Sequence, residues 1–556
     1  MYWIKSRSWR AAVLCLLGAS SILPPKSIAG AEDGAEFVGY VSKPQLVARP
    51  GGGAFVLAGN ATGLYLTALT PLGVREPTWP LGGVRIAEPT NFCTMADSAG
   101  GFYLAWILRV NSFGRVKLSR YQGNGVPAAG WPDTGIVVGS SPRSWNPKLC
   151  VDKFGAAYVS WYQDEQQSAA TVGGFVTRIL PDGEQAPGWP NAGTQVSAFN
   201  GGSATELVLG AGREGVLACW LAPDFNGFGP FVYATRFLAN GTRAPGWPTA
   251  GTQLSTRASA TSWGNPSICS DGLGGLFAAW VAFPANAAPY AIRFTSLGVK
   301  AAGWPTDGLQ IAQNHAWAPS IATDAQGGAF LTWESSDWHV RLQHLSDSGF
   351  QFFPPGGLQV SALVEPSQGQ TAAADGYGGV YITWRTAGPS YGRFTRIDAI
   401  GEPSLGWTGD GIPFLNNSTT PALVPAPDGG AIIAQDQYHG PDTLKTMTRR
   451  VLPDGSLASV VDVEPSLGAA APGLTITPLP ARDRVALSAG GADVQSVEIL
   501  DALGRSVCVP TRVTTTSVAA AWELKDAAGS RLSPGLYFVR ARTNKGVLTA
   551  KLVVAW

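Results

Sequence analysis

Short hydrophobic runs alternate along this chain with glycine-rich polar turns, and one ten-residue pattern recurs. Residues 324–333 read Asp-Ala-Gln-Gly-Gly-Ala-Phe-Leu-Thr-Trp, and close copies stand at residues 271–280 and 375–384. Aspartate can hydrogen-bond backbone groups ahead of it and glycine accepts a positive φ, so the first half of the pattern suits a tight turn. The apolar and aromatic residues that follow suit a strand. The pattern therefore predicts strand, turn and strand, with the second strand ending near the tryptophan.

A second pattern follows the first within each unit. Gly-Trp-Pro triplets stand at residues 130–132, 188–190, 246–248 and 303–305, and each precedes another glycine and a short β-like run. One more strand lies between the two patterns, with an arginine at a fixed position before a turn glycine: Arg120, Arg178, Arg236, Arg293, Arg396 and Arg450. Four short strands in a unit of about 50 residues are typical of a β-propeller blade.

The number of units follows from the second turn glycine or its replacement. It recurs at Gly53, Gly101, Ala156, Gly215, Gly275, Gly328, Gly379 and Gly430. We therefore predict an all-β fold with an eight-bladed β-propeller over residues 36–460, seven blades being the alternative count. The last unit lacks the Gly-Trp-Pro strand, whereas residues 36–42 are strand-like and belong to no unit. We expect this run to supply the outer strand of the last blade and close the ring, because closure leaves no long exposed sheet edge.

The N-terminus carries a targeting pattern. Three basic residues, Lys5, Arg7 and Arg10, precede an apolar run at residues 11–23. This run is too short to span a membrane, and small residues at 27–31 offer a cleavage site. Residues 1–30 are therefore predicted to be a secretory signal peptide. Because no later stretch is long and apolar enough to cross a bilayer, we expect an exported chain without a transmembrane segment.

The repeat stops before the C-terminus. Residues 461–473 are rich in Pro, Gly and Ala and indicate a linker, and residues 474–556 form a different strand-rich segment. That segment carries an Asp-x-x-Gly-Arg motif at residues 501–505, then Trp522, then Pro-Gly-x-Tyr-Phe at residues 534–538. This combination resembles the FlgD-type immunoglobulin-like domains of bacterial surface proteins and the type A sorting domain of the type IX secretion system. The resemblance implies a small Ig-like β-sandwich, contact with secretion machinery, and a secreted or surface-attached bacterial protein.

Candidate chemistry is sparse. Charged residues make up 14% of the chain and the net charge is +1, which argues against a nucleic-acid partner. Three of the four histidines, His315, His339 and His344, lie in one unit and His439 lies in the last, and no motif frames them. Carboxylates such as Glu334 and Asp337, or Asp164 and Glu165, are neighbours in sequence only. No histidine or paired cysteine stands at metal-ligand spacing, so no metal and no cofactor is predicted.

The repeated polar residues are better explained as scaffold. A catalytic carboxylate is needed once, whereas the turn aspartate recurs in five units, so we interpret it as a turn former. The repeated arginines are expected to bond that aspartate or to stack on the Gly-Trp-Pro indoles, and the indoles to pack between blades. Three cysteines that share one strand position are expected to be free thiols: Cys93, Cys150 and Cys269.

The connections between strands differ from the repeats. In a four-stranded blade alternate turns emerge at opposite ends, so the two formulaic turns share one end and the variable loops share the other. Function concentrates on variable loops held by a rigid scaffold, and these loops are rich in aromatic residues. We expect the ligand contacts to include Trp145, Trp263, Trp317, Trp338, Tyr290, Tyr391 and Tyr438.

Two functions remain open, with a third of lower rank. The first is a non-catalytic binding or adhesion protein whose loop end recognises an extracellular glycan or protein. The alternative is a secreted polysaccharide-acting enzyme, a hydrolase or lyase, with its site at the channel mouth. A converging carboxylate pair or an Arg, His and Tyr cluster would favour the enzyme. The third is a purely structural component of a surface layer.

Overall fold

The computed structural model divides the chain into two compact units, Met1–Val460 and Val461–Trp556. The expected signal peptide lies outside the described residues. These are residues 37–38, 44–49, 51–60, 63–80, 83–87, 91–97, 99–110, 113–164, 172–196, 205–222, 230–259, 265–282, 287–313, 315–361, 366–387, 391–415, 419–440, 443–458, 475–477, 484–488, 494–500, 506–508, 520–523, 525, 530–533, 535–543 and 546–554.

The first unit consists of four-stranded antiparallel sheets that resemble propeller blades. In most of them four consecutive strands pair in chain order. These sheets are β2 (Gln45–Ala48) to β5 (Val84–Ala87) with β3 (Ala54–Asn60) and β4 (Gly63–Leu69); β6 (Phe92–Ala96), β7 (Phe102–Val110), β8 (Phe113–Tyr121) and β9 (Ile136–Val138); β10 (Ser144–Val151), β11 (Ala157–Asp164), β12 (Val172–Ile179) and β13 (Thr194–Gln195); and β14 (Thr205–Gly212), β15 (Gly215–Ala222), β16 (Phe231–Leu238) and β17 (Thr252–Gln253).

The remaining sheets of this unit follow the same order, except the last. They are β18 (Ser267–Ser270), β19 (Leu276–Ala282), β20 (Ala288–Phe294) and β21 (Leu309–Gln310); β22 (Ala316–Thr323), β23 (Ala329–Ser335), β24 (Val340–Leu345) and β25 (Leu358–Gln359); β26 (Ser367–Ala374), β27 (Val380–Thr386), β28 (Gly392–Ile397) and β29 (Ile412–Pro413); and β30 (Ala422–Pro425), β31 (Ala431–Gly440) and β32 (Thr443–Val451) with β1 (Phe37–Val38).

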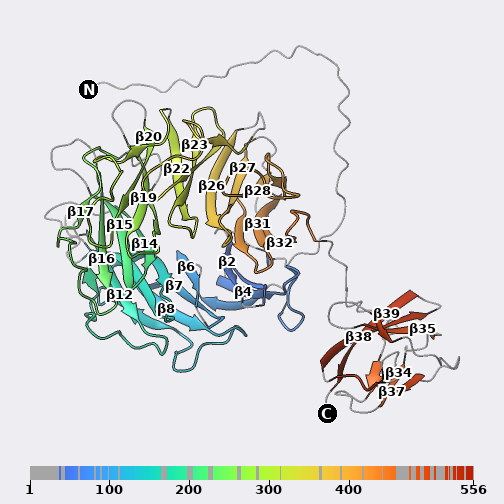
Figure 1. Cartoon of the computed structure of the whole chain (residues 1–556). Coiled ribbons are helices and arrows are strands. Elements are labelled where there is room, and N and C mark those ends of the chain that lie inside the picture. Colours follow the sequence, from blue (N-terminus) through green and yellow to red (C-terminus); the bar gives the residue numbers. More distant parts are fainter. Residues whose placement is uncertain are drawn as a thin grey trace. The chain divides into compact units, whose positions relative to one another are not determined.

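The first strands of successive sheets pack against one another around a ring (Figure 1). The last of them, β30, contacts β2, so the final sheet lies beside the first. At the outer edge of the final sheet, Phe37 pairs with Thr446 and Val38 with Lys445. The expected pairing of the N-terminal run with the last sheet is therefore confirmed.

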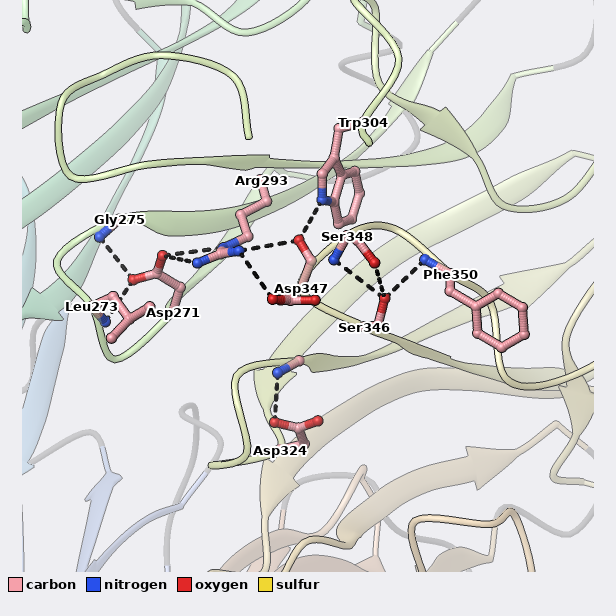
Figure 2. A network of polar contacts seen from close by, with 11 residues as sticks. Asp271, Leu273, Gly275, Arg293, Trp304, Asp324, Ser346, Asp347, Ser348 and Phe350 are labelled. Carbon is pink, nitrogen blue, oxygen red and sulfur yellow. Dashed lines mark hydrogen bonds and ion pairs between the residues drawn. The ribbon is translucent and has the colours of Figure 1, made fainter. Parts of the chain in front are cut away.

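One polar network repeats between neighbouring sheets, and we call it the Asp–Arg–Trp staple. Asp271 Oδ1 accepts hydrogen bonds from the backbone N–H groups of Leu273 and Gly275 at 2.9 and 2.7 Å. Its Oδ2 accepts from Arg293 Nε and Nη2 at 3.1 and 2.9 Å. Arg293 Nη1 and Trp304 Nε1 both donate to the carbonyl oxygen of Asp347 in the next sheet, at 3.1 and 2.8 Å (Figure 2).

The staple explains why these residue types recur. Arginine binds the turn aspartate in the same way at Arg120–Asp97, Arg178–Asp152 and Arg396–Asp375. The indoles of Trp131, Trp189, Trp247 and Trp407 likewise donate to a turn carbonyl of the following sheet. The expected bond between arginine and turn aspartate is confirmed in these sheets, whereas Arg236 donates, among the described residues, only to the Ser296 carbonyl. The arginines lie over tyrosine or phenylalanine rings and not over the Gly-Trp-Pro indoles.

In sheet β22–β25 a histidine replaces the staple arginine. His344 Nε2 lies 2.9 Å from Asp324 Oδ2, and its Nδ1 lies 3.0 Å from the carbonyl oxygen of Ala399 in the next sheet. Burial acts to raise the pKa of Asp324, but hydrogen bonds from His344 and from two backbone N–H groups outweigh it and hold that pKa below its ordinary value. The ionised carboxylate is therefore the form that the fold stabilises.

This pair predicts a measurable acid sensitivity. A carboxyl whose pKa is lowered on folding contributes stability above its unfolded pKa, and that contribution is lost as the pH falls through the folded pKa. As the pH falls from about 3.8 toward the lower pKa of folded Asp324, the free energy of unfolding should therefore decrease by up to about 1.4 kcal/mol per pH unit. Urea titrations at several pH values should show a shallower acid slope in Asp324→Asn than in wild type. An unchanged slope would contradict the assignment.

A second set of tryptophans fills the sheet interiors. The second strands continue two or three residues beyond the tryptophan at which they were expected to end. These tryptophans are fully buried: Trp161, Trp220, Trp280, Trp333 and Trp384. In three sheets the residue opposite on the third strand is an aromatic ring stacked over the indole, namely Phe175, Tyr233 and Tyr290. Aromatic cover of a buried indole is thus part of the repeat.

The second unit is a smaller all-β body. One sheet has the order β36 (Ser506–Cys508), β35 (Val494–Leu500), β38 (Gly535–Thr543) and β39 (Gly546–Val554), and the other joins β33 (Thr475–Thr477), β34 (Arg484–Ser488) and β37 (Ala520–Glu523). Val497, Ile499, Val539 and Leu552 form part of its core. Among the described residues of the whole chain, no helix has the length and apolar character needed to cross a membrane.

The expectation that three cysteines sharing one strand position are free thiols is confirmed. Cys93, Cys150 and Cys269 are free thiols. Burial raises the pKa of the Cys93 thiol to about 12, so this thiol stays protonated near neutral pH and is a poor nucleophile. Among the described residues, no group of three or more His, Cys, Asp or Glu side chains is placed to hold a metal ion.

Candidate functional site at the loop end

The loop end is the end of the first unit that carries the turns between second and third strands and the connections between sheets. Trp145 and Trp317 lie there near the start of β10 and β22, Trp338 lies in the β23–β24 turn, and Tyr391 directly precedes β28. Tyr438 lies within β31, with a side chain outside the described set. Trp263 also lies outside the described residues.

Tyr290 does not belong to the exposed surface where we expected it. It lies within β20, is 4% exposed, and pairs directly with Trp280 on the neighbouring strand. The two rings are 6.1 Å apart at 22°, and the guanidinium of Arg257 lies 5.3 Å from the Tyr290 centroid. Tyr290 covers the buried indole in the same manner as Phe175 and Tyr233, so it is scaffold.

Trp145 and Trp317 are presented by matching irregularities of their strands. The pairing register shifts just after each tryptophan, between Trp145 and Lys148 and between Trp317 and Ser320. The residue that follows each tryptophan, Asn146 or Ala318, has a φ of 53° or 47°. A bulge re-aims the side chains beside it, so these two strands share a device that the sequence pattern did not reveal.

Trp338 occupies a strained turn position. The Trp338 N–H donates to the Ser335 carbonyl at 2.8 Å and the Ser335 N–H donates to the His339 carbonyl at 2.9 Å. This is the pattern of a hairpin loop whose last residue takes the left-handed conformation, a place that glycine normally fills. Trp338 has a φ of 63° there. A bulky residue with positive φ is an outlier that costs about 1–2 kcal/mol, and such strain clusters at functional sites.

The strain brings two indoles together. Trp317 and Trp338 stack with centroids 5.5 Å apart and planes at 9°. Trp338 remains 45% exposed, and Trp317 is half-buried. We call this pair the Trp317–Trp338 platform. It offers a flat, rigid apolar surface at the loop end.

Polar groups border the platform. Glu334 stands directly opposite Trp317 in the β22–β23 pair, so the two side chains share one face of the sheet. A carboxylate oxygen of Glu334 accepts a hydrogen bond from the Gly369 N–H of the next sheet. Burial raises the pKa of Glu334, although that bond and the charge of Arg385 act against the rise. The exposed Arg385 donates to Gln368 Oε1 at 3.1 Å.

A related acid lies in the last sheet. Asp436 follows Gln435, which stands where other sheets have the buried tryptophan, so its position matches that of Glu334. Burial raises the pKa of Asp436 to about 6, against a hydrogen bond from Thr446 Oγ1 at 2.5 Å. Two carboxyl groups at the loop end therefore hold their protons at higher pH than usual.

Sequence reasoning missed Arg385 and Asp436 and weighed Glu334 only with Asp337. A signal was present, because the residue after the buried tryptophan is apolar in several sheets, as Ile107, Leu221 and Val281. A charged residue at this position is therefore a departure from the repeat. Asp337 lies in the β23–β24 turn and bonds Ser335 and Arg341, whereas Glu334 accepts from Gly369 of the next sheet.

Comparison with known proteins identifies the second unit. Residues 475–555 match a family model described as a secretion system C-terminal sorting domain. The chain is thus an exported bacterial protein, secreted or displayed at the cell surface, and its C-terminal domain implies an interaction with the type IX secretion machinery. No curated protein sequence matches the chain.

Solved structures similar to this chain include several propellers and propeller-like proteins. The BP39L lectin from Burkholderia pseudomallei is 11% identical, with 68% of this chain and 100% of the lectin covered and a TM-score of 0.43. A Dos1 propeller is 11% identical, with 75% and 94% covered and a TM-score of 0.39. A protein of unknown function from Dyadobacter fermentans is 10% identical, with 76% and 99% covered and a TM-score of 0.33.

Proposed function

We propose that this protein is an exported, non-catalytic binding protein that recognises an extracellular glycan through the loop end of a closed eight-bladed β-propeller. The Ig-like C-terminal domain would serve sorting or attachment to the cell surface. In this proposal Trp317 and Trp338 make the principal contact, and Trp145 on β10 provides a further aromatic contact. Tyr391 is assigned to the rim of the same end.

The observation that carries the proposal is the conformation of Trp338. A glycine would fit this turn without strain, yet the position holds a large indole that is half exposed and stacked on Trp317. Packing alone does not require this, because the side chain leaves much of its area in water. Rigid aromatic surfaces give contact area at low entropic cost, and the pyranose ring of a sugar presents a flat apolar face to such a surface.

A second candidate function is a secreted polysaccharide-acting hydrolase or lyase. The feature in its favour is the raised pKa of the buried Glu334 and Asp436 carboxyl groups, because a general acid needs a raised pKa. Release of reducing ends from a polysaccharide that depends on Glu334, and fails in Glu334→Gln, would support this function over pure binding.

The test of the proposed function is a change of Trp338 to glycine. The variant relieves backbone strain while it loses one stacked ring pair, so its stability should stay within about 1 kcal/mol of wild type. Binding to the polysaccharide selected on a glycan array should fall at least about tenfold, as for an aromatic hot spot. Affinity electrophoresis in that polysaccharide measures the change.

The matched control is Leu405→Ala. Leu405 is 94% exposed but lies in the β28–β29 connection, at the opposite end of the sheets, so its loss should leave binding unchanged. Equal binding by wild type and Trp338→Gly would refute the platform. Binding of a protein rather than a glycan in a parallel pull-down would redirect the proposal to a protein ligand.

A further inference from the structure

In sheet β22–β25 an arginine replaces the aromatic ring that stacks over the buried indole elsewhere. Where Phe175, Tyr233 and Tyr290 stack over their tryptophans, β24 places Arg341 directly opposite Trp333. Arg341 and Trp333 share one face of the sheet, the face opposite to that of Glu334 and the platform. Arg341 takes the place of a stacked ring, yet Trp333 is only 1% exposed, so the indole itself stays covered.

Two other sheets also have a cation at this position, but they use it differently. Lys117 Nζ donates to the Gly135 carbonyl at 2.7 Å, and Arg393 Nη1 donates to the Gly411 carbonyl at 3.0 Å, each within its own sheet. Arg341 instead turns to the β23–β24 turn, where its Nη2 donates to Asp337 Oδ2 at 2.5 Å. Its Nε lies 3.4 Å from Ser335 Oγ.

The result is a cavity of about 560 Å³ between β21 and sheet β22–β25. Its wall includes Trp333, Ser335, Asp337, Arg341, Gln310 and Gln351. This volume lies within the range of small-molecule sites. Apolar surface is thus combined with several hydrogen-bonding groups in a space that the scaffold elsewhere fills.

The lining is rich in both donors and acceptors and is balanced in charge. Gln310 uses its Nε2 to bond the Ala312 carbonyl, which keeps its Oε1 as an acceptor. Gln351 uses its Oε1 to accept from Gln343, which keeps its Nε2 as a donor. Asp337 carries one negative charge and Arg341 one positive charge. Hydrogen bonds from Ser335 and Arg341 outweigh burial and hold the pKa of Asp337 below its ordinary value, so the pair stays ionised.

We propose that this cavity binds one neutral sugar residue, as a subsite separate from the Trp317–Trp338 platform. A sugar hydroxyl is at once donor and acceptor, which suits alternating carboxylate, guanidinium and amide groups. Because the Asp337–Arg341 pair has no net charge, a uronic acid gains nothing there over a neutral sugar. The inference rests on the proposed function, and one turn, residues 335–339, serves both surfaces.

The experiment uses the full exported chain and five simple probes. These are the methyl glycosides of glucose, galactose, mannose and xylose and the methyl glycoside of glucuronic acid, each titrated to about 20 mM, where weak monosaccharide binding is measurable. Saturation-transfer NMR should detect at least one neutral glycoside and no preference for the glucuronide. The key variant is Arg341→Tyr, which restores the cover seen at Tyr233 and Tyr290.

Arg341→Tyr should reduce binding of the neutral glycoside at least about tenfold, with a melting temperature no lower than that of wild type. Asp337→Asn is the second variant, because it keeps the shape but leaves Arg341 unpaired. It should weaken the neutral glycoside and make the glucuronide the preferred probe.

The outcomes separate this subsite from the platform. Leu405→Ala, at the opposite end of the sheets, should leave glycoside binding within about twofold of wild type, whereas Trp338→Gly should reduce polysaccharide binding. Polysaccharide binding that is unchanged in Trp338→Gly would contradict the proposed function but not the subsite. Absence of glycoside binding in wild type, or binding that survives both Arg341→Tyr and Asp337→Asn, overturns the subsite.

Discussion

Replacing Asp271 by alanine is expected to lower the free energy of unfolding by about 3–5 kcal/mol, the cost of breaking a buried ion pair from one side. The Asp271 side chain is 1% exposed and its partner Arg293 12% exposed. The substitution removes the acceptor for two backbone N–H groups and leaves a guanidinium without its counter-charge. Urea unfolding of the full chain, followed by tryptophan fluorescence, measures the loss.

The matched control for this prediction is Asp347→Ala. The Asp347 carboxylate is 66% exposed and 3.9 Å from Arg293, whereas the staple uses the backbone carbonyl of that residue. Because an exposed ion pair contributes about 1 kcal/mol or less, the control should be nearly silent. Equal losses from the two substitutions would show that the staple is not what holds adjacent sheets together.

Replacing Gly251 by alanine should be strongly destabilising for the addition of one methyl group, with an expected loss of about 3 kcal/mol. Gly251 has a φ of +83°, and a Cβ there would lie 2.4 Å from Cη2 of the buried Trp220 indole. Both backbone strain and overpacking therefore oppose the substitution. The same unfolding assay applies.

A second glycine separates the effect of backbone strain from the effect of overpacking. Gly272 has a φ of +75° but open space around the position of a Cβ. Gly272→Ala should therefore show the backbone strain alone, about 1–2 kcal/mol. If both substitutions cost the same, the close contact with Trp220 adds nothing and the indole is free to move.

Much of the scaffold could be predicted from the chain, because its residues repeat. Arg and Asp recur at fixed positions, which predicts an ion pair in several sheets. The Asp–Arg–Trp staple contains that ion pair. The missing strand of the last unit and the unassigned run at residues 36–42 likewise match each other. These features are local or periodic along the chain, so the sequence is enough to predict them.

The candidate site could be predicted only in part, for the opposite reason. Trp317 and Trp338 are 21 residues apart, and their stacking depends on a bulge and on a left-handed turn residue that no turn signal marks. Tyr290 was misplaced because alternation alone does not tell a ring that faces solvent from one that covers an indole. The cavity beside Trp333 depends on the turn of Arg341 toward Asp337, which only comparison of the aligned sheets makes visible.

The two-residue strand β1 has a consequence for how this molecule comes into being. Its partners in β32 stand about 400 residues further along the chain, and joining such distant segments has a large entropic cost. During synthesis β1 is made near the start, and its partner β32 is made only about 400 residues later. We expect a chain that ends before β32 to lack this strand pairing, so the outer edge of the last sheet stays open until synthesis has passed β32.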